Sequence, residues 1–203
     1  MADQQRALNA ICPYFTMFPL EFPLGVLTGR ARSRDRVIDP FCGRGTTAFA
    51  ARLLGLTTVG IDSNPVAAAI ASAKLVSVTP EAVVTEARRI LRNKAQPRVP
   101  TAEFWSWAFH PQVLQQLCKL RSGLNSESPS GSQIALKAVV LGALHGPLSV
   151  HVPSYFSNQS PRTYAPKPRD AVKFWKERSL RPPHVDVLEI IKVRAERYFT
   201  SYP

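Results

Sequence analysis

Residues 39–55, DPFCGRGTTAFAARLLG, constrain the possible fold more than any other stretch of the chain. Two glycines one residue apart separate a short β-type run at 36–39 from an alanine-rich segment at 46–55, whose apolar residues recur three and four apart. Glycine permits a tight turn in which backbone N–H groups approach a ligand closely, and the start of a helix favours an anionic group. The pattern therefore predicts a strand, a ligand-binding loop and a helix.

A second strand and a second helix are predicted directly after the first helix. Residues 57–62, TTVGID, have the strand pattern, and residues 63–75 the helix pattern, with Asn64 as N-cap and Pro65 in the first turn. This order favours a parallel sheet with right-handed crossovers. Asp62 ends the second strand, where a carboxylate can accept hydrogen bonds from both hydroxyls of a ribose. An α/β fold with a nucleoside-type ligand is expected.

Three interpretations of the glycine loop compete with such a ligand. A dinucleotide-binding fold usually has a third glycine in the first helix, but here Thr46, Thr47 and Ala48 follow the second glycine. No Gly-x(4)-Gly-Lys-Ser/Thr loop occurs, which argues against a nucleoside triphosphatase. A glycine turn without any ligand is the remaining alternative.

The segment DPFCGRGTT resembles motif I of the S-adenosylmethionine-dependent DNA amino-methyltransferases, which modify adenine N6 or cytosine N4. GIDSNP resembles their next motif, and PYFTMFPLEFP resembles the motif X segment that closes the methionine end of the cofactor. The resemblance covers residues 11–75 and is loose from 76 to 200. It implies a Rossmann-like methyltransferase fold, S-adenosylmethionine as cofactor, and site-specific DNA methylation of the restriction–modification kind.

The resemblance also implies a set of cofactor-binding residues. Asp39 would lie beside the methionine part, Asp62 would bind the ribose, and Thr46 would cap the first helix. The complete set is Tyr14, Thr16, Phe18, Asp39, Pro40, Phe41, Gly43, Gly45, Thr46, Ile61, Asp62 and Asn64.

One part of the methyltransferase pattern is missing. These enzymes carry an Asp/Asn/Ser-Pro-Pro-Tyr/Phe/Trp loop that accepts hydrogen bonds from the target amino group and stacks on the flipped base. Residues 181–184, RPPH, lack both flanking residues, and a helix started by proline is expected there instead. The catalytic residue therefore stays unknown. Nor do residues 76–203 supply the further strands of a seven-stranded fold, so the fold is predicted to be incomplete.

Three explanations of this incompleteness remain open. The chain can be a natural half that a second polypeptide completes, a truncated product, or a catalytically silent DNA-binding or regulatory subunit that retains a methyltransferase-like fold. Adenine and cytosine remain equal candidates for the target base.

The charge of the chain is concentrated in its second half. The whole chain has 26 Lys+Arg and 14 Asp+Glu, a net charge of +12. Residues 76–203 hold 18 basic and 9 acidic residues (+9), whereas residues 1–75 hold 8 and 5 (+3). Cations favour a polyanion such as DNA. Residues 154–178 interleave aromatic and basic side chains, and the DNA-binding candidates are Arg162, Tyr164, Lys167 and Arg169.

We therefore predict a cofactor-binding part at 1–75 and a mostly helical, basic part at 76–203 that contacts DNA or recognises the target sequence. The helices expected in the second part span 80–95, 110–124, 134–148, 171–178 and 185–199. The first ten residues are polar, and the apolar stretch 134–150 is short and interrupted by Lys137 and His145, so a cytoplasmic protein without membrane contact is expected. Three cysteines without metal-ligand spacing predict free thiols and no metal site.

Overall fold

The computed structural model describes residues 3–12, 16–146, 155–158 and 167–200. Within these residues the fold is mixed α/β, mostly helical, with a small two-stranded parallel sheet. The strands are β1 (Arg36–Asp39) and β2 (Thr57–Gly60). The helices are α1 (Asp3–Asn9), α2 (Glu21–Arg30), α3 (Thr46–Leu53), α4 (Pro65–Ala73), α5 (Pro80–Leu91), α6 (Glu103–Ala108), α7 (Pro111–Gly123), α8 (Gly131–Ala143), α9 (Pro168–Glu177) and α10 (Val187–Phe199).

The predicted order of strand, loop, helix, strand and helix is confirmed. β1 and β2 pair in parallel, with Ile38 opposite Val59. The second strand is shorter than predicted and ends at Gly60. The chain turns there because the Asp62 carboxylate accepts a hydrogen bond from the Asn64 N–H at 2.8 Å, which forms a local turn that competes with an extended strand.

The two helix starts near the loop differ. Asn64 caps α4 as predicted, because its side chain accepts a hydrogen bond from the Val66 N–H at 2.9 Å, and Pro65 is the first helical residue. The prediction that Thr46 caps α3 is wrong: the N-cap is Gly45, and Thr46 is already helical and buried. Gly45 has a left-handed backbone (φ +71°), and the glycine loop ends there. Because glycine has no side chain, α3 begins without a side-chain cap hydrogen bond.

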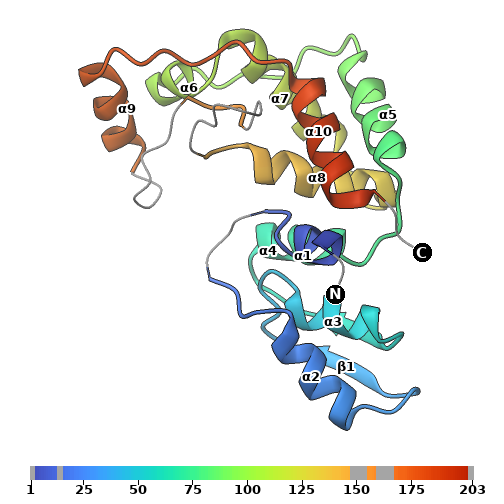
Figure 1. Ribbon diagram of the computed structural model, residues 1–203. Coiled ribbons are helices and arrows are strands. Elements are labelled where there is room, and N and C mark those ends of the chain that lie inside the picture. The colour runs from blue at the N-terminus through green and yellow to red at the C-terminus, as the bar shows by residue number, and fades with distance from the viewer. Residues whose placement is uncertain (1–2, 13–15, 147–154, 159–166, 201–203) are drawn as a thin grey trace.

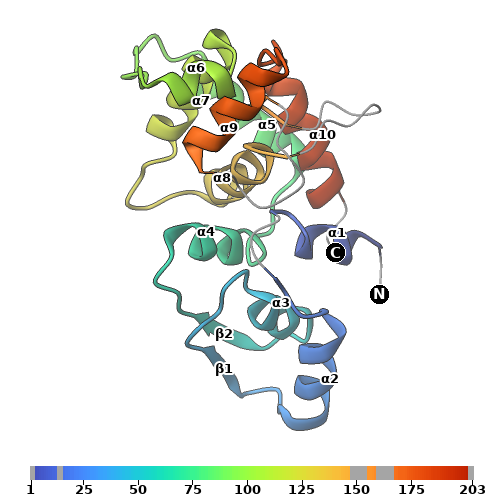
Figure 2. The same ribbon diagram turned by 90° about the vertical axis from the view of Figure 1, so that its left-hand side faces the viewer.

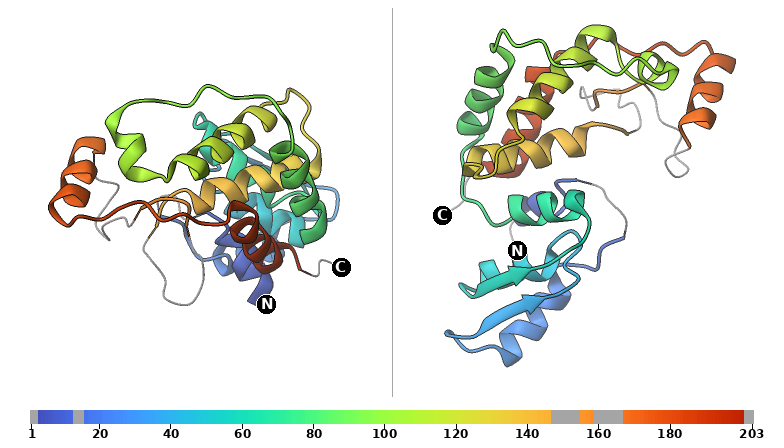
Figure 3. Two further views of the ribbon diagram at one scale, coloured as in Figure 1. Left: turned by 90° about the horizontal axis from the view of Figure 1, so that it is seen from above. Right: turned by 180° about the vertical axis from the view of Figure 1, so that it is seen from behind.

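The elements form layers that are visible from two perpendicular directions (Figures 1 and 2). The sheet lies at the bottom with α2 and α3, helices α1 and α4 lie in the middle, and α5–α10 lie above (Figure 1). α3 packs against both strands, while α4 packs against α8 and α1 against α10. Figure 3 shows the same layering from behind and the crossing of the upper helices from above.

One continuous hydrophobic core joins these layers. It includes Phe49 of α3, Ile70 of α4, Leu136 of α8 and Ile190 of α10, all fully buried. The core therefore runs across residue 75, and the division of the chain at that residue stays a prediction.

The predicted helices of the second part are all present, with ends shifted by up to a few residues. The expected proline-started helix at 181–184 is wrong, because α10 begins at Val187 and Asp186 caps it by accepting a hydrogen bond from the Glu189 N–H. The sequence pattern also missed α1 and the six-residue α6. Among the described residues, β1 and β2 are the only strands.

Candidate functional site

A pocket of about 580 Å³ lies at the glycine loop between β1 and α3. Cavities of a few hundred cubic ångströms suit ligands of nucleoside size and above. Its wall is formed by Thr16, Met17, Phe18, Ile38, Asp39, Phe41, Cys42, Gly43, Arg44, Thr46 and Thr47. The fold thus brings the segment before α2 against the loop, as the resemblance to motif X and motif I requires.

The two glycines of the loop serve different purposes. Both have left-handed backbones, with φ +49° at Gly43 and +71° at Gly45. A Cβ atom on Gly45 would lie 2.6 Å from the Cβ of Ala71, so the loop packs directly on α4. A Cβ atom on Gly43 would meet nothing within 4 Å. Gly45 therefore fixes the loop to the protein, whereas Gly43 faces open space that a ligand can approach.

Asp62 connects the end of the second strand to the glycine loop. One carboxylate oxygen accepts a hydrogen bond from the Gly43 N–H at 2.9 Å, and the other accepts from the Asn64 N–H at 2.8 Å. A carboxylate offers about four acceptor positions, so two remain for hydroxyl groups. Asp62 can hold the loop in place and still bind a ribose.

The other predicted residues have more varied surroundings. Thr16, Phe18, Asp39, Phe41, Gly43 and Thr46 line the pocket, whereas Pro40, Gly45, Ile61, Asp62 and Asn64 do not. The Phe41 ring is 88% exposed and Ile61 is 54% exposed, so both have apolar surface free for a flat ligand. The Asn64 side chain is engaged as a helix cap. Tyr14 lies outside the described residues.

Two further side chains at the loop have defined surroundings. The Asp39 carboxylate accepts a hydrogen bond from the Phe41 N–H at 3.2 Å and orders the turn. Burial, followed by the charges of Asp39 and Asp62, raises the pKa of the Cys42 thiol. Cys42 therefore stays protonated at neutral pH and has no thiolate to react.

Sequence reasoning missed three features near the pocket. Arg44 and Thr47 line it, and Lys74 of the turn after α4 is fully buried, donating a hydrogen bond to the Asn9 side chain at 2.7 Å. The position of Arg44 between the two glycines was a usable signal. The burial of Lys74 has no comparable signal, because lysine is rarely buried.

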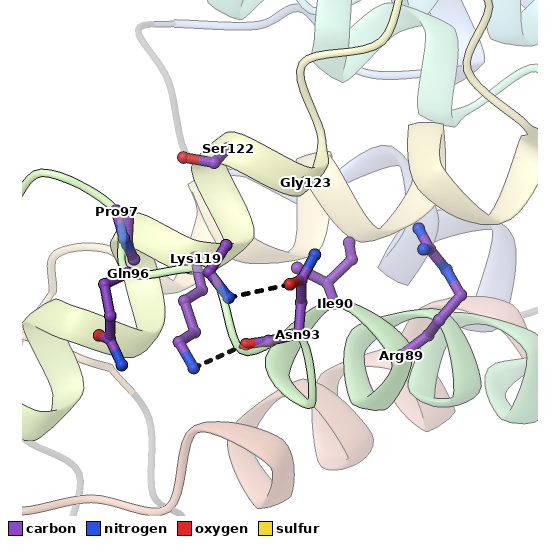
Figure 4. A pocket seen from close by; sticks show the side chains of 9 residues that line it. Arg89, Ile90, Asn93, Gln96, Pro97, Lys119, Ser122 and Gly123 are labelled. Carbon is purple, nitrogen blue, oxygen red and sulfur yellow. Dashed lines mark hydrogen bonds between the residues drawn. The ribbon is translucent and has the colours of Figure 1, made fainter.

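A second hollow of about 260 Å³ lies between α5 and α7, away from the glycine loop (Figure 4). Its lining includes Arg89, Asn93 and Lys119. Lys119 donates a hydrogen bond to the backbone carbonyl of Asn93 at 2.9 Å, just beyond the end of α5. Arg89 pairs with Glu86. These cations stabilise helix α5 locally, and we assign the hollow no ligand.

The predicted DNA-binding residues are only partly described. Lys167 and Arg169 are exposed at the start of α9, and Arg162 and Tyr164 lie outside the described residues. α9 lies at the end of the helical part far from the sheet (Figure 1). The RPPH segment also belongs to the helical part, because Arg181 lies over Trp107 at 4.4 Å and the His184 ring lies 4.5 Å from that of His110.

Cysteine chemistry, metals and membranes can be judged for the described part of the chain. Cys12, Cys42 and Cys118 are free thiols, as predicted. No group of three or more His, Cys, Asp or Glu residues with the arrangement of a metal site occurs within those ranges. No helix found there has the length and apolar character needed to cross a membrane.

The parallel β1–loop–α3–β2 unit, the open space at Gly43 and the acid after the second strand give the chain the arrangement of an α/β protein with a glycine loop between strand and helix. Residues 3–73 match the protein-family model N6_N4_Mtase, a DNA methylase family. The resemblance of this part to the adenine-N6 and cytosine-N4 DNA methyltransferases is thereby confirmed. The match ends before α5. Comparisons with curated proteins and with solved structures find no match.

Proposed function

We propose that the chain supplies the S-adenosylmethionine-binding part of a DNA amino-methyltransferase with an incomplete Rossmann-like fold. The observation that carries this proposal is the match of residues 3–73 to a DNA methylase family, over the same segment that forms the pocket. The bond from the Gly43 N–H to Asp62 supports it, because it unites the two motifs of the resemblance in one site.

The residues present fit this cofactor. Asp62 retains acceptor positions for the ribose hydroxyls, and the exposed surfaces of Phe41 and Ile61 suit the adenine. The pocket wall carries one acid, Asp39, and one base, Arg44, which complements a zwitterionic amino acid group. A dinucleotide would instead bring two phosphates to a wall with a single cation.

The reaction that such a site serves is methyl transfer to an exocyclic amine of adenine or cytosine. S-adenosylmethionine supplies a methyl group on a sulfonium; the new N–C bond forms as the C–S bond breaks, its electron pair stays on sulfur, and the amine loses a proton to water. This chain's own residues would bind the cofactor and orient its methyl group. Proximity and orientation account for much of the rate in reactions of this kind. No metal is required. Its catalytic loop remains unassigned.

The open face of the sheet and its free edges support completion by a further polypeptide, which would cover the face and add strands at an edge. Ile38 and Val59 face each other across β1 and β2 and are 64% and 49% exposed. α3 covers the other face. Two-stranded sheets are marginal alone, and their free edges offer unpaired backbone groups. We propose that a strand-bearing polypeptide, which also carries the catalytic loop, pairs with this sheet.

The helical part is the proposed DNA-facing side, and a cytoplasmic location is consistent with this role. Its net charge of +9 and the exposed Lys167 and Arg169 support phosphate binding. Arg162 and Tyr164 complete the predicted set, outside the described residues. A catalytically silent DNA-binding subunit remains the second candidate, favoured by the absence of a Pro-Pro-Tyr-type motif from the 203 residues.

A calorimetric titration tests the cofactor site. The purified chain should bind S-adenosylmethionine saturably and should not bind NAD. Asp62→Ala should weaken binding by about tenfold or more, because it removes ribose acceptors and the bond to Gly43. Asp35→Ala is the matched control, since Asp35 also accepts a backbone hydrogen bond, but from the Arg32 N–H in the turn before β1 and not from the glycine loop. A folded chain that binds no cofactor would favour the silent subunit.

A further inference from the structure

Arg44 is a cation in the wall of the loop pocket without a partner among the described residues. It lies between the two left-handed glycines, so the loop geometry holds its backbone fixed. None of the described acids forms an ion pair with it, and its Nε–H is buried without a hydrogen-bond acceptor. Buried donors are nearly always paired, and an unpaired one costs free energy. An unpaired guanidinium in the wall of a pocket is a candidate contact for a ligand.

The surroundings of Arg44 make an anionic ligand the best match. Lys74 lies close enough for the charge of Arg44 to lower its pKa, although burial is the larger cause. Cys12, which also lies near both cations, has its pKa raised by burial and stays a neutral thiol. Arg44 therefore carries a positive charge with which no described acid forms an ion pair, and Lys74 adds to it in the fraction of chains in which its ammonium is protonated.

The opposite charge lies elsewhere in the pocket wall. Asp39 and Arg44 are its two charged residues, and the other wall residues are apolar, hydroxyl-bearing or glycine. Asp39 is at the end of β1, whereas Arg44 is on the far side of Gly43, next to the first residues of α3. A wall with one acid and one guanidinium matches a ligand that carries one ammonium and one carboxylate group.

We propose that Arg44 binds the carboxylate of the amino acid group of S-adenosylmethionine. This proposal rests on the proposed function and adds a residue that determines which ligands the site accepts. The guanidinium suits a carboxylate because its two terminal nitrogens offer parallel N–H donors. Thr46 and Thr47 line the same side of the pocket and can donate hydroxyl hydrogen bonds to the same group.

The test compares two ligands that differ only in the carboxylate, S-adenosylmethionine and its decarboxylated form. Calorimetry with the wild-type chain should show about 10- to 100-fold tighter binding of the carboxylate-bearing ligand. In Arg44→Met this preference should fall to about twofold or less, with the affinity for the decarboxylated ligand unchanged. Arg44→Lys should retain part of the preference, because it keeps the charge and loses the fork of donors. Circular dichroism and thermal unfolding check that each variant is folded.

Each alternative outcome has its own meaning. Equal weakening of both ligands in Arg44→Met would overturn the proposal and show that Arg44 only shapes the loop. A wild-type chain that binds both ligands equally well would also overturn it, while the proposed function would stand. A wild-type chain that binds neither ligand would refute the proposed function itself, and Arg44→Lys guards against a misfolded Arg44→Met.

Discussion

The α/β part around the sheet and the helical part above it differ in how fully they bury their large apolar side chains. Among the described residues, the large apolar side chains that are exposed all lie between residues 18 and 61. The helical part instead buries its large side chains, including Phe109, Phe156 and Trp175. A surface of this kind on a soluble protein marks an interaction site. Exposed apolar side chains are therefore concentrated around the sheet, although one continuous core joins the two parts.

The two parts also differ in charge and in what they can bind. The first 75 residues carry a net charge of +3 and contain the loop pocket, whose wall holds one acid, Asp39, and one cation, Arg44. The remainder carries +9, largely on exposed helix surfaces such as the start of α9. The contrast favours recognition of a small zwitterion in one part and of a polyanion in the other. The predictions below test this contrast.

Two isoleucine-to-alanine substitutions should show the difference in burial between the parts most clearly. Ile190→Ala, at a fully buried position in α10, should lower the free energy of unfolding by about 2–5 kcal/mol, because it leaves a cavity. Ile38→Ala, at a 64% exposed position on β1, should change it by less than about 0.5 kcal/mol. Urea unfolding followed by circular dichroism measures both.

A large cost at Ile38 would contradict the open-face interpretation. It would mean that the face is already covered in solution, for example by a second copy of the chain. Sedimentation of the wild-type chain and of Ile38→Ala would then identify that covering, because the mutation would weaken the association.

The two glycines of the loop provide a matched pair within the α/β part. Gly45→Ala should destabilise the chain by about 3 kcal/mol, because its Cβ would overlap Ala71 and its backbone is left-handed. Gly43→Ala, with open space around the new Cβ, should cost only about 1 kcal/mol. Unfolding experiments compare the stabilities, and cofactor titration should show that Gly43→Ala still weakens binding. Equal stabilities would mean that α4 moves to accommodate the new side chain.

Local signals explain which parts of this structure the sequence predicts. The strand–loop–helix–strand order, the Asn64 cap and the Pro65 start depend on residues within a few positions of one another, so they are predictable. Helix α6 was not predicted because six residues give little periodicity. Its aromatic contacts, such as that of Phe104 with Trp175, also involve residues far away in the sequence.

The candidate site shows the same limit. The acid after the second strand and the loop glycines follow from pattern, but the Lys74–Asn9 bond joins residues 65 positions apart. Lysine is rarely buried, so no local rule places it in a core. The lack of a partner for Arg44 is likewise a property of the folded pocket, not of the sequence around it.

The buried Lys74 should give the chain a distinctive pH dependence. Burial and the charge of Arg44 lower the pKa of Lys74 from its ordinary 10.5 to about 7, against smaller opposing effects of Cys12 and Cys42. Between these values the unfolded chain binds more protons than the folded chain, so stability rises with pH. The free energy of unfolding should increase by about 1–2 kcal/mol from about pH 7 to about pH 8.5.

Lys74→Met should remove most of this rise, because methionine has no proton to release. Lys137→Met, at an exposed position of α8, is the control and should leave the rise intact. Urea unfolding of the three proteins at both pH values measures the effect. A rise that persists in Lys74→Met would assign it to another group and would show that Lys74 is charged in the folded chain.

The smallest expected effects concern DNA binding by the start of α9. Lys167→Gln combined with Arg169→Gln should weaken binding to a DNA duplex several-fold at moderate salt, and should lower the slope of log K against log salt by about two. Stability should be nearly unchanged, because both side chains are exposed. Fluorescence anisotropy across a salt series measures affinity and slope together.

The matched control is Arg88→Gln with Arg92→Gln, which removes two exposed charges from α5 and leaves the overall net charge equal to that of the α9 variant. If the whole helical part attracts DNA only through its net charge, the two double variants will weaken binding equally. A larger loss in the α9 variant would instead assign the contact to that end of the molecule. Because α9 lies far from the sheet (Figure 1), DNA would then have to extend along the helical layers to bring a base to the loop pocket.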